Sequence, residues 1–304
     1  MRQHLVVATA LLGFMAASSP CMALQVTVSS PKSSFVQGEP VYLWVDYYND
    51  TGDEIGLPSD YLFGFDVLKV RNRSGELVRQ PGEQGKRLPP GGNRIKRIGA
   101  KEHLVFFANL LDHVNLIDAD AYDVQIVAPN PAPERYLDPE HPLLPPSKLI
   151  RGPIESNRWE FTISPGSGEA YDLVAKPLRE KTAGTFTLWE SAAEIVEKYP
   201  DSAYGPYAVM YEVGQLLNVT GRDPGPRLAS AQALMDGLRS GQAAFEYLDI
   251  AILQYAERLA RIGHESEASK LLVDLQKQKH SDVTNLYIGQ VLRGWNEARQ
   301  EVPK

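Results

Sequence analysis

The chain has 304 residues, and its 31 lysines and arginines against 38 aspartates and glutamates give a formal net charge of −7. A chain of this charge lacks the basic surface that binds phosphate backbones, so we exclude a nucleic-acid-binding function. Hydrophobic residues make up 43% of the sequence, which is enough to build packed cores. The length fits a short leader followed by two domains.

The first 23 residues are typical of a secretion signal that is removed from the mature protein. Arg2 and His4 give it a polar start, residues 5–16 are almost wholly apolar, and Cys21-Met22-Ala23 offers small residues where a signal peptidase reads. This apolar run is too short to span a bilayer, and no later run reaches spanning length. Pro20 stands where a lipoprotein anchor needs a small residue. We therefore expect an exported protein, periplasmic or extracellular, whose single cysteine leaves with the signal.

From Leu24 to Pro165 the apolar residues recur at every second position, the period of a strand with one buried face. The clearest segment contains Val41, Leu43, Val45 and Tyr47, between the turn-forming clusters 38–40 and 49–52. The same alternation predicts further strands at 24–29, 63–67, 77–78, 95–98, 104–106, 122–126 and 159–163. About seven short strands separated by turns predict an antiparallel β-sandwich over residues 24–165.

Two stretches of this half resemble strands of bacterial immunoglobulin-like domains. These are Gly38-Glu39-Pro40-Val41 through Asn49, and Asp120-Ala121-Tyr122-Asp123-Val124. In that family the tyrosine often packs at a strand corner, although Ala121 stands here where a glycine commonly precedes it. The resemblance implies an immunoglobulin-like architecture and carries no activity with it.

After Pro165-Gly166-Ser167-Gly168 the hydrophobic period becomes that of a helix. Leu188, Ala192, Ile195 and Tyr199 lie on one helical face, which Pro200 ends. Further helices are predicted around 207–214 and over 228–238, 247–262, 266–279 and 285–299. Residues 166–304 are therefore predicted to form a helical domain.

The helix pair around Gly263 resembles a tetratricopeptide repeat. Ile252, Tyr255, Ala256 and Leu259 match its first helix, and Ala268 and Leu272 match its second. Small Ala256 and Ala268 let the two helices approach closely. The segment 199–204, followed by Val213-Gly214, is similar to the entry of a second, degenerate repeat, which departs from the pattern at Pro226. The resemblance implies a repeat-like domain with a concave surface that binds a protein or peptide.

No catalytic, cofactor-binding or phosphate-binding motif occurs in the sequence, so we expect a non-catalytic protein without a cofactor. The five histidines after the signal do not pair at metal-ligand spacing, and we expect no metal. Asp118, Asp120 and Asp123 do not form a calcium loop, because the sixth position holds aspartate where an EF-hand requires glycine.

We expect the helical concavity to hold a protein or peptide segment, with Tyr207, Tyr211, Tyr255 and Arg258 as the residues to test first. The second candidate surface is the stretch 129–146, which contains seven prolines together with Tyr136 and His141. A long insertion of this kind either binds a partner or packs along the seam between the domains. It could also present a bait loop, as in a proteinase inhibitor.

An alternative function is a carbohydrate-binding accessory module. Tyr42, Trp44 and Tyr48 lie on the strand face opposite Val41, Leu43 and Val45, where an aromatic row could stack a sugar. The competing interpretation is that Trp44 is buried, because a sandwich must bury large apolar side chains. The sequence alone does not identify the partner or the oligomeric state.

Overall fold

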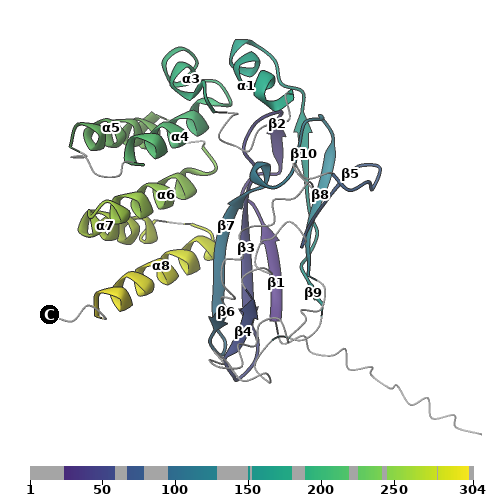
Figure 1. Ribbon diagram of the computed structural model, residues 1–304, viewed down its shortest axis with the longest axis vertical. Helices are drawn as coiled ribbons and strands as arrows, with labels where there is room; N and C mark the ends of the chain where they lie inside the picture. Colours follow the sequence, from purple (N-terminus) through teal and green to yellow (C-terminus); the bar gives the residue numbers. More distant parts are fainter. Residues whose placement is uncertain are drawn as a thin grey trace, which may run out of the picture.

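The computed structural model describes residues 24–58, 67–78, 95–128, 150, 153–179, 189–218, 225–241, 245–278 and 280–300. Within these residues, β-strands fill the first half of the chain, and seven α-helices follow from Glu169 onward (Figure 1). The protein is therefore of mixed α and β structure, with sheets before helices, as the change of hydrophobic period predicts. The predicted signal, residues 1–23, lies outside the described part.

The strands form three sheets, whose orders are β1-β3-β7, β2-β10-β8-β5 and β4-β6, with the short β9 paired to β8. One pair departs from the predicted antiparallel arrangement, because β2 runs parallel to β10, with Phe35 opposite Ile163. The strands are β1 (Leu24–Ser29), β2 (Ser34–Val36), β3 (Tyr42–Asn49), β4 (Ile55–Pro58), β5 (Leu68–Asn72), β6 (Ile95–Ile98), β7 (His103–Asn109), β8 (Ala121–Ala128), β9 (Ile154–Glu155) and β10 (Trp159–Ser164).

The central strand β3 confirms the predicted alternation except at Trp44, which is buried on the opposite face. Leu43, Val45 and Tyr47 are fully buried on one of its faces. The expected strand at 63–67 falls mainly on residues outside the described ranges, and the observed strand β5 begins just after it, at Leu68. Residue Leu77 forms only an isolated bridge to Arg71.

Most of the helices pack as neighbours in chain order (Figure 1): α4 lies against α5, α6 against α7, and α8 follows α7. The turn between α6 and α7 contains Gly263 with a φ of +90°, and Ala256 and Ala268 are fully buried in this pair. The α-helices are α1 (Glu169–Arg179), α3 (Ala192–Lys198), α4 (Gly205–Leu217), α5 (Gly225–Gly241), α6 (Leu248–Arg261), α7 (Glu265–Gln276) and α8 (Asp282–Gln300).

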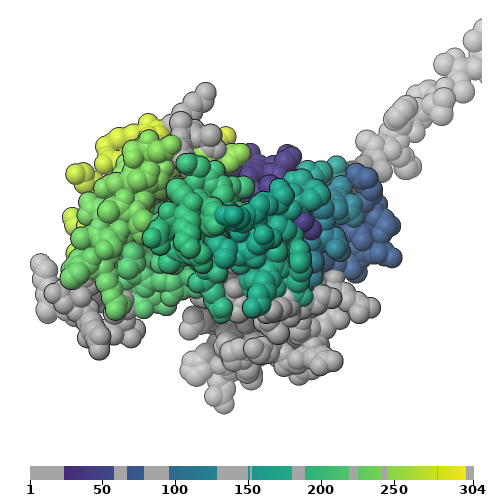
Figure 2. Space-filling view, turned by 90° about the horizontal axis from the view of Figure 1, so that it is seen from above, coloured from purple at the N-terminus to yellow at the C-terminus, as the bar shows by residue number. Residues whose placement is uncertain are grey.

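The helices pack directly on the strands, and Figure 2 shows purple strand residues next to the green helical residues. The buried apolar residues of both halves belong to one continuous cluster.

A buried carboxylate, that of Glu39, lies at the junction and is 2% exposed. It accepts hydrogen bonds from the Val36 amide at 2.8 Å and the Tyr207 hydroxyl at 2.8 Å, and it pairs with Lys32. A buried charge needs such partners, so the hydrogen bonds to Glu39 fix α4 against the strands.

The residues just before Glu39 complete the junction. The Gln37 carbonyl accepts a hydrogen bond from the Tyr204 hydroxyl at 2.8 Å, and its side-chain oxygen accepts one from the Gly166 amide at 3.0 Å. Gly38 has a φ of +83°, and a Cβ there would lie 2.5 Å from Cγ1 of Val174 in α1. Only glycine satisfies both the left-handed backbone and this close approach.

Side-chain amides close both edges of the sheet β1-β3-β7. On β1, Asn157 accepts from the Val28 amide at 2.7 Å and donates to the Val28 carbonyl at 2.9 Å. On β7, Gln290 of α8 accepts from the Val105 amide at 3.0 Å and donates to the Val105 carbonyl at 3.0 Å. Each amide thus replaces a neighbouring strand at one residue, which keeps an open edge from pairing with another chain.

Candidate functional site

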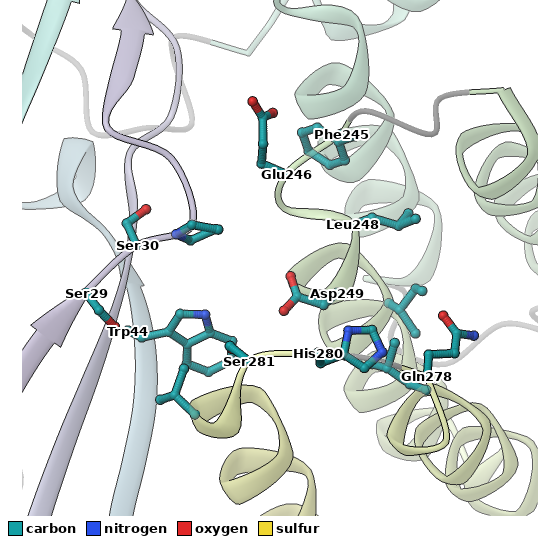
Figure 3. A pocket seen from close by; sticks show the side chains of 14 residues that line it. Ser29, Ser30, Trp44, Phe245, Glu246, Leu248, Asp249, Gln278, His280 and Ser281 are labelled. Atoms are coloured by element: carbon teal, nitrogen blue, oxygen red, sulfur yellow. The ribbon is translucent and has the colours of Figure 1, made fainter.

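A cavity of about 410 Å³ lies where the strands meet helices α6, α7 and α8 (Figure 3). Pockets of a few hundred cubic ångströms with apolar walls and a few polar groups are the usual form of a binding site. Residues from both halves of the chain line it: Ser29, Ser30, Pro31, Trp44, Phe245, Glu246, Leu248, Asp249, Ile252, Leu275, Gln278, His280, Ser281 and Val283.

The walls of the cavity come from different elements that the fold brings together. The strands contribute the end of β1, with Ser29, and Trp44 of β3; the helices contribute Leu248 and Ile252 of α6, Leu275 of α7 and Val283 of α8. In Figure 3 the strand side and the helix side face each other across an open space. Half of the lining side chains are apolar, so the cavity offers a surface for an apolar or amphipathic group.

Two hydrogen bonds hold the side chain of Asp249 in the cavity wall. Its Oδ2 accepts a hydrogen bond from the Thr284 hydroxyl at 2.6 Å, and Thr284 is fully buried. Its Oδ1 accepts from the Ile250 amide at 2.8 Å. The carboxylate points from α6 toward Trp44 and the end of β1 (Figure 3). These bonds hold the carboxylate in one orientation before any ligand arrives.

A more open hollow of about 560 Å³ adjoins this cavity on the surface of α5 and α6. It shares Leu248, Ile252 and Gln278 with the cavity and adds Asp236 and Arg239. The last two form an ion pair at 3.9 Å. The shared residues make the hollow a continuation of the cavity toward the outer helices.

Two of the predicted partner-binding tyrosines are buried inside the fold. Tyr207 is 3% exposed and donates to Glu39, so it serves the junction between α4 and the strands. Tyr255 is 4% exposed, and burial raises the pKa of its hydroxyl to about 12. Neither lines the cavity. The helical pattern that singled them out reflects the core, because apolar and aromatic residues at this spacing face a neighbouring element.

The other two helical candidates are half-buried. Arg258 of α6 donates from Nη1 to the Gly214 carbonyl of α4 at 3.0 Å, and burial lowers the pKa of its guanidinium. Tyr211 packs against the apolar core from α4. Arg258 therefore ties two neighbouring helices together, and the structure does not bring these residues to the cavity. Tyr136 and His141 lie outside the described residues.

The expected aromatic row on β3 is not an exposed surface, because the helical half of the chain covers Tyr42 and Trp44, in the first half of the strand. Trp44 is 2% exposed, with its ring 5.5 Å from that of Tyr287 of α8. Tyr42 packs edge-on against Tyr247, at 5.4 Å between ring centres, and burial raises its pKa to about 12. An exposed row is therefore the wrong expectation for this face, while the competing interpretation, burial of Trp44, is confirmed.

Tyr48, at the far end of the same strand, stacks on His103 at 4.5 Å between ring centres. His103 Nδ1 lies 2.9 Å from the Asp46 carboxylate. Tyr48 is half-buried and separate from the cavity, so the three aromatic residues do not act as one surface.

The described residues contain no group of three or more metal-ligating side chains. Two of the three aspartates considered for calcium lie next to arginines: Asp123 is 3.4 Å from Arg71, and Asp120 is 3.9 Å from Arg73. Among the described helices, none is long and apolar enough to cross a membrane.

Sequence reasoning missed most of the cavity residues, among them Phe245, Leu248 and Asp249. The one sequence feature that pointed to the cavity is Asp249 in the first turn of a predicted helix, but the helix dipole favours an aspartate at that position in any case.

Comparison of the chain with protein-family models and with curated proteins finds no match.

Proposed function

We propose that this protein binds a protein or peptide segment in the cavity between the strands and helices α6–α8, without making or breaking a bond. The observation that carries the proposal is the cavity itself, of about 410 Å³, with apolar walls and a pre-oriented carboxylate. The location differs from the expected one, since Tyr207 and Tyr255 belong to the core.

The arrangement of the cavity supports a peptide more than a rigid small ligand. Ser29 and Ser30 lie at the end of β1, and the space continues past Leu248 into the hollow on α5 and α6. An extended segment could therefore place one side chain in the cavity while its backbone follows this opening. Peptide recognition commonly combines such pockets with backbone contacts along an open path.

A cavity-filling variant tests the proposal. Leu248→Trp places a larger side chain in the cavity, whereas Leu77→Trp adds the same group at a position that is 56% exposed. Both variants and the unchanged protein serve as bait for affinity capture from the native envelope or culture fluid, followed by mass spectrometry. We expect the partner to be captured by the unchanged protein and by Leu77→Trp, but not by Leu248→Trp. Equal capture of the partner by all three baits would show that the partner does not bind in the cavity.

Export is part of the proposal and depends on the first 23 residues, whose composition fits a cleaved signal. The mature protein is then expected in the periplasm or outside the cell, beginning at Leu24. N-terminal sequencing of the protein from its native source tests this. A mature chain that still begins at Met1 would contradict it.

The finer fold assignment is also a proposal: an immunoglobulin-like sandwich over 24–165 followed by a tetratricopeptide-like helical domain over 166–304. The Tyr122 hydroxyl donates to the Asp118 carbonyl at 2.8 Å, four residues upstream, which is the bond of a tyrosine corner. The helix pairs α4–α5 and α6–α7, with α8 after them, supply the support for the helical domain.

Carbohydrate binding remains the second candidate, because Trp44 also lines the cavity. A sugar stacked there would change tryptophan fluorescence, and a Trp44→Phe variant would lose that change. Soluble polysaccharides that leave the fluorescence of the unchanged protein constant would argue against this candidate. The third candidate, a proteinase inhibitor that presents the loop 129–146, is tested by incubating the protein with proteinases of several classes.

A further inference from the structure

All the charged side chains among the described residues that line the cavity are acidic. They are Glu246, which is exposed, and Asp249, which is half-buried. No lysine or arginine of the described part lines this cavity, and Arg239 in the adjoining hollow is ion-paired with Asp236. The remaining lining groups are apolar side chains, hydroxyls, an amide and an imidazole. The cavity is therefore complementary to a ligand that is apolar along its length and positive at one end.

The position of Asp249 makes the cavity more specific for a positively charged group. Thr284 and the Ile250 amide hold its carboxylate so that it points toward Trp44 (Figure 3). A cation placed between them would meet a carboxylate and the indole of Trp44. Cations are attracted both by carboxylates and by the faces of aromatic rings. A neutral apolar group in the same place would take the carboxylate out of water and leave its negative charge balanced only by the neutral Thr284 hydroxyl and the Ile250 amide, which is unfavourable.

We infer that the cavity recognises a basic side chain, that of an arginine or lysine, within the bound peptide segment. The inference deepens the proposed function and rests on it. Arginine and lysine both carry an aliphatic stem that packs on apolar walls and a charged head that needs an acidic partner. Leu248 and Ile252 provide such walls, while Asp249 and Glu246 provide the acidic partners.

The experiment uses immobilised full-length protein and pools of short peptide amides that are randomised except at a fixed central residue. The central residue is arginine, its neutral isostere citrulline, or glutamate. Retained peptide is quantified by mass spectrometry. We expect the arginine pool to be retained at least about fivefold more than the citrulline pool, as for a charge-assisted hydrogen bond to a half-buried carboxylate. The glutamate pool should be retained least.

Matched variants separate the cavity from the general negative charge of the protein. Glu246→Gln with Asp249→Asn removes the two acids of the cavity, and Glu190→Gln with Glu197→Gln makes the same charge change in and beside α3. The first pair should abolish the preference for arginine, while the second should preserve it. Because Asp249 also accepts a bond from Thr284, Glu246→Gln alone is measured as well, and it should reduce the preference partly. Circular dichroism verifies that each variant is folded.

The outcomes distinguish this inference from the proposed function. Equal retention of the arginine and citrulline pools, with both lost in Leu248→Trp, would overturn the recognition of a basic side chain but keep peptide binding in the cavity. A preference for arginine that persists in Glu246→Gln with Asp249→Asn would place the charge recognition elsewhere and overturn the inference. Retention of all pools unchanged by Leu248→Trp would overturn the proposed function as well.

Discussion

The two-point contact between Gln290 and β7 leads to a quantitative prediction. Replacement by methionine, Gln290→Met, keeps a side chain of similar length but removes both hydrogen bonds to Val105, each 3.0 Å long. Val105 is 1% exposed, so water does not readily replace the lost partner. At about 1 kcal/mol of net stabilisation for each bond, opening of α8 from β7 should become easier by about 2 kcal/mol.

Amide hydrogen exchange measures this opening directly, because Val105 is buried and its amide exchanges only when α8 moves away from β7. A change of 2 kcal/mol corresponds to exchange that is about thirtyfold faster. Gln232→Met, at an exposed position of α5, serves as the control and should leave the exchange of β7 unchanged. Asn157→Leu, at the opposite edge, should have a similar effect on Val28. Exchange at Val105 that is the same in Gln290→Met and in the control would refute the idea that the amide closes this edge.

Three further predictions concern the junction and one half-buried histidine, His113. Tyr207→Phe removes the hydroxyl that donates to buried Glu39, and chemical denaturation should show a loss of about 1.5–3 kcal/mol; an unchanged midpoint would contradict the role given to this bond. Gly38→Ala should destabilise more than Gly75→Ala in the same assay, because both glycines have a φ of +83° but only a Cβ at Gly38 would meet a side chain, at 2.5 Å. Burial lowers the pKa of His113 from 6.5 to about 4, so between these values the unfolded chain binds a proton that the folded chain does not. The free energy of unfolding should therefore fall by up to about 3 kcal/mol as the pH drops from about 7 to 4. His113→Gln should flatten the profile of denaturation midpoint against pH.

Local patterns in the sequence predict most of the regular elements. The alternation of apolar residues predicts β3 correctly because the strand face that carries Leu43 and Val45 is fully buried. Strands of the same sheet also pair with β3 on both sides. The helix pair α6–α7 is predicted within a few residues of its observed bounds, since its apolar face is continuous and Gly263 supplies the turn. Helix α1 is missed, because Pro177 lies inside it and a proline normally ends a helical pattern.

The candidate site is much harder to predict, because its walls come from residues far apart in the chain. Trp44 and Asp249 line one cavity only after helices α6–α8 pack on the strands, and no local period in the sequence predicts that packing. The same packing covers the aromatic face of β3, which has the alternation of an exposed surface when the strand is considered alone. Tyr207 and Tyr255 illustrate the converse: a helical pattern marks them, but they serve the core.

The central claim is that the cavity between the strands and helices α6–α8 is where a partner binds. Hydrogen exchange of the protein with and without the captured partner tests it most directly. We expect protection in the segments around Ser30, Asp249 and His280, which line the cavity, with little change in β5 and β8. Protection confined to other surfaces, with these three segments unchanged, would contradict the claim.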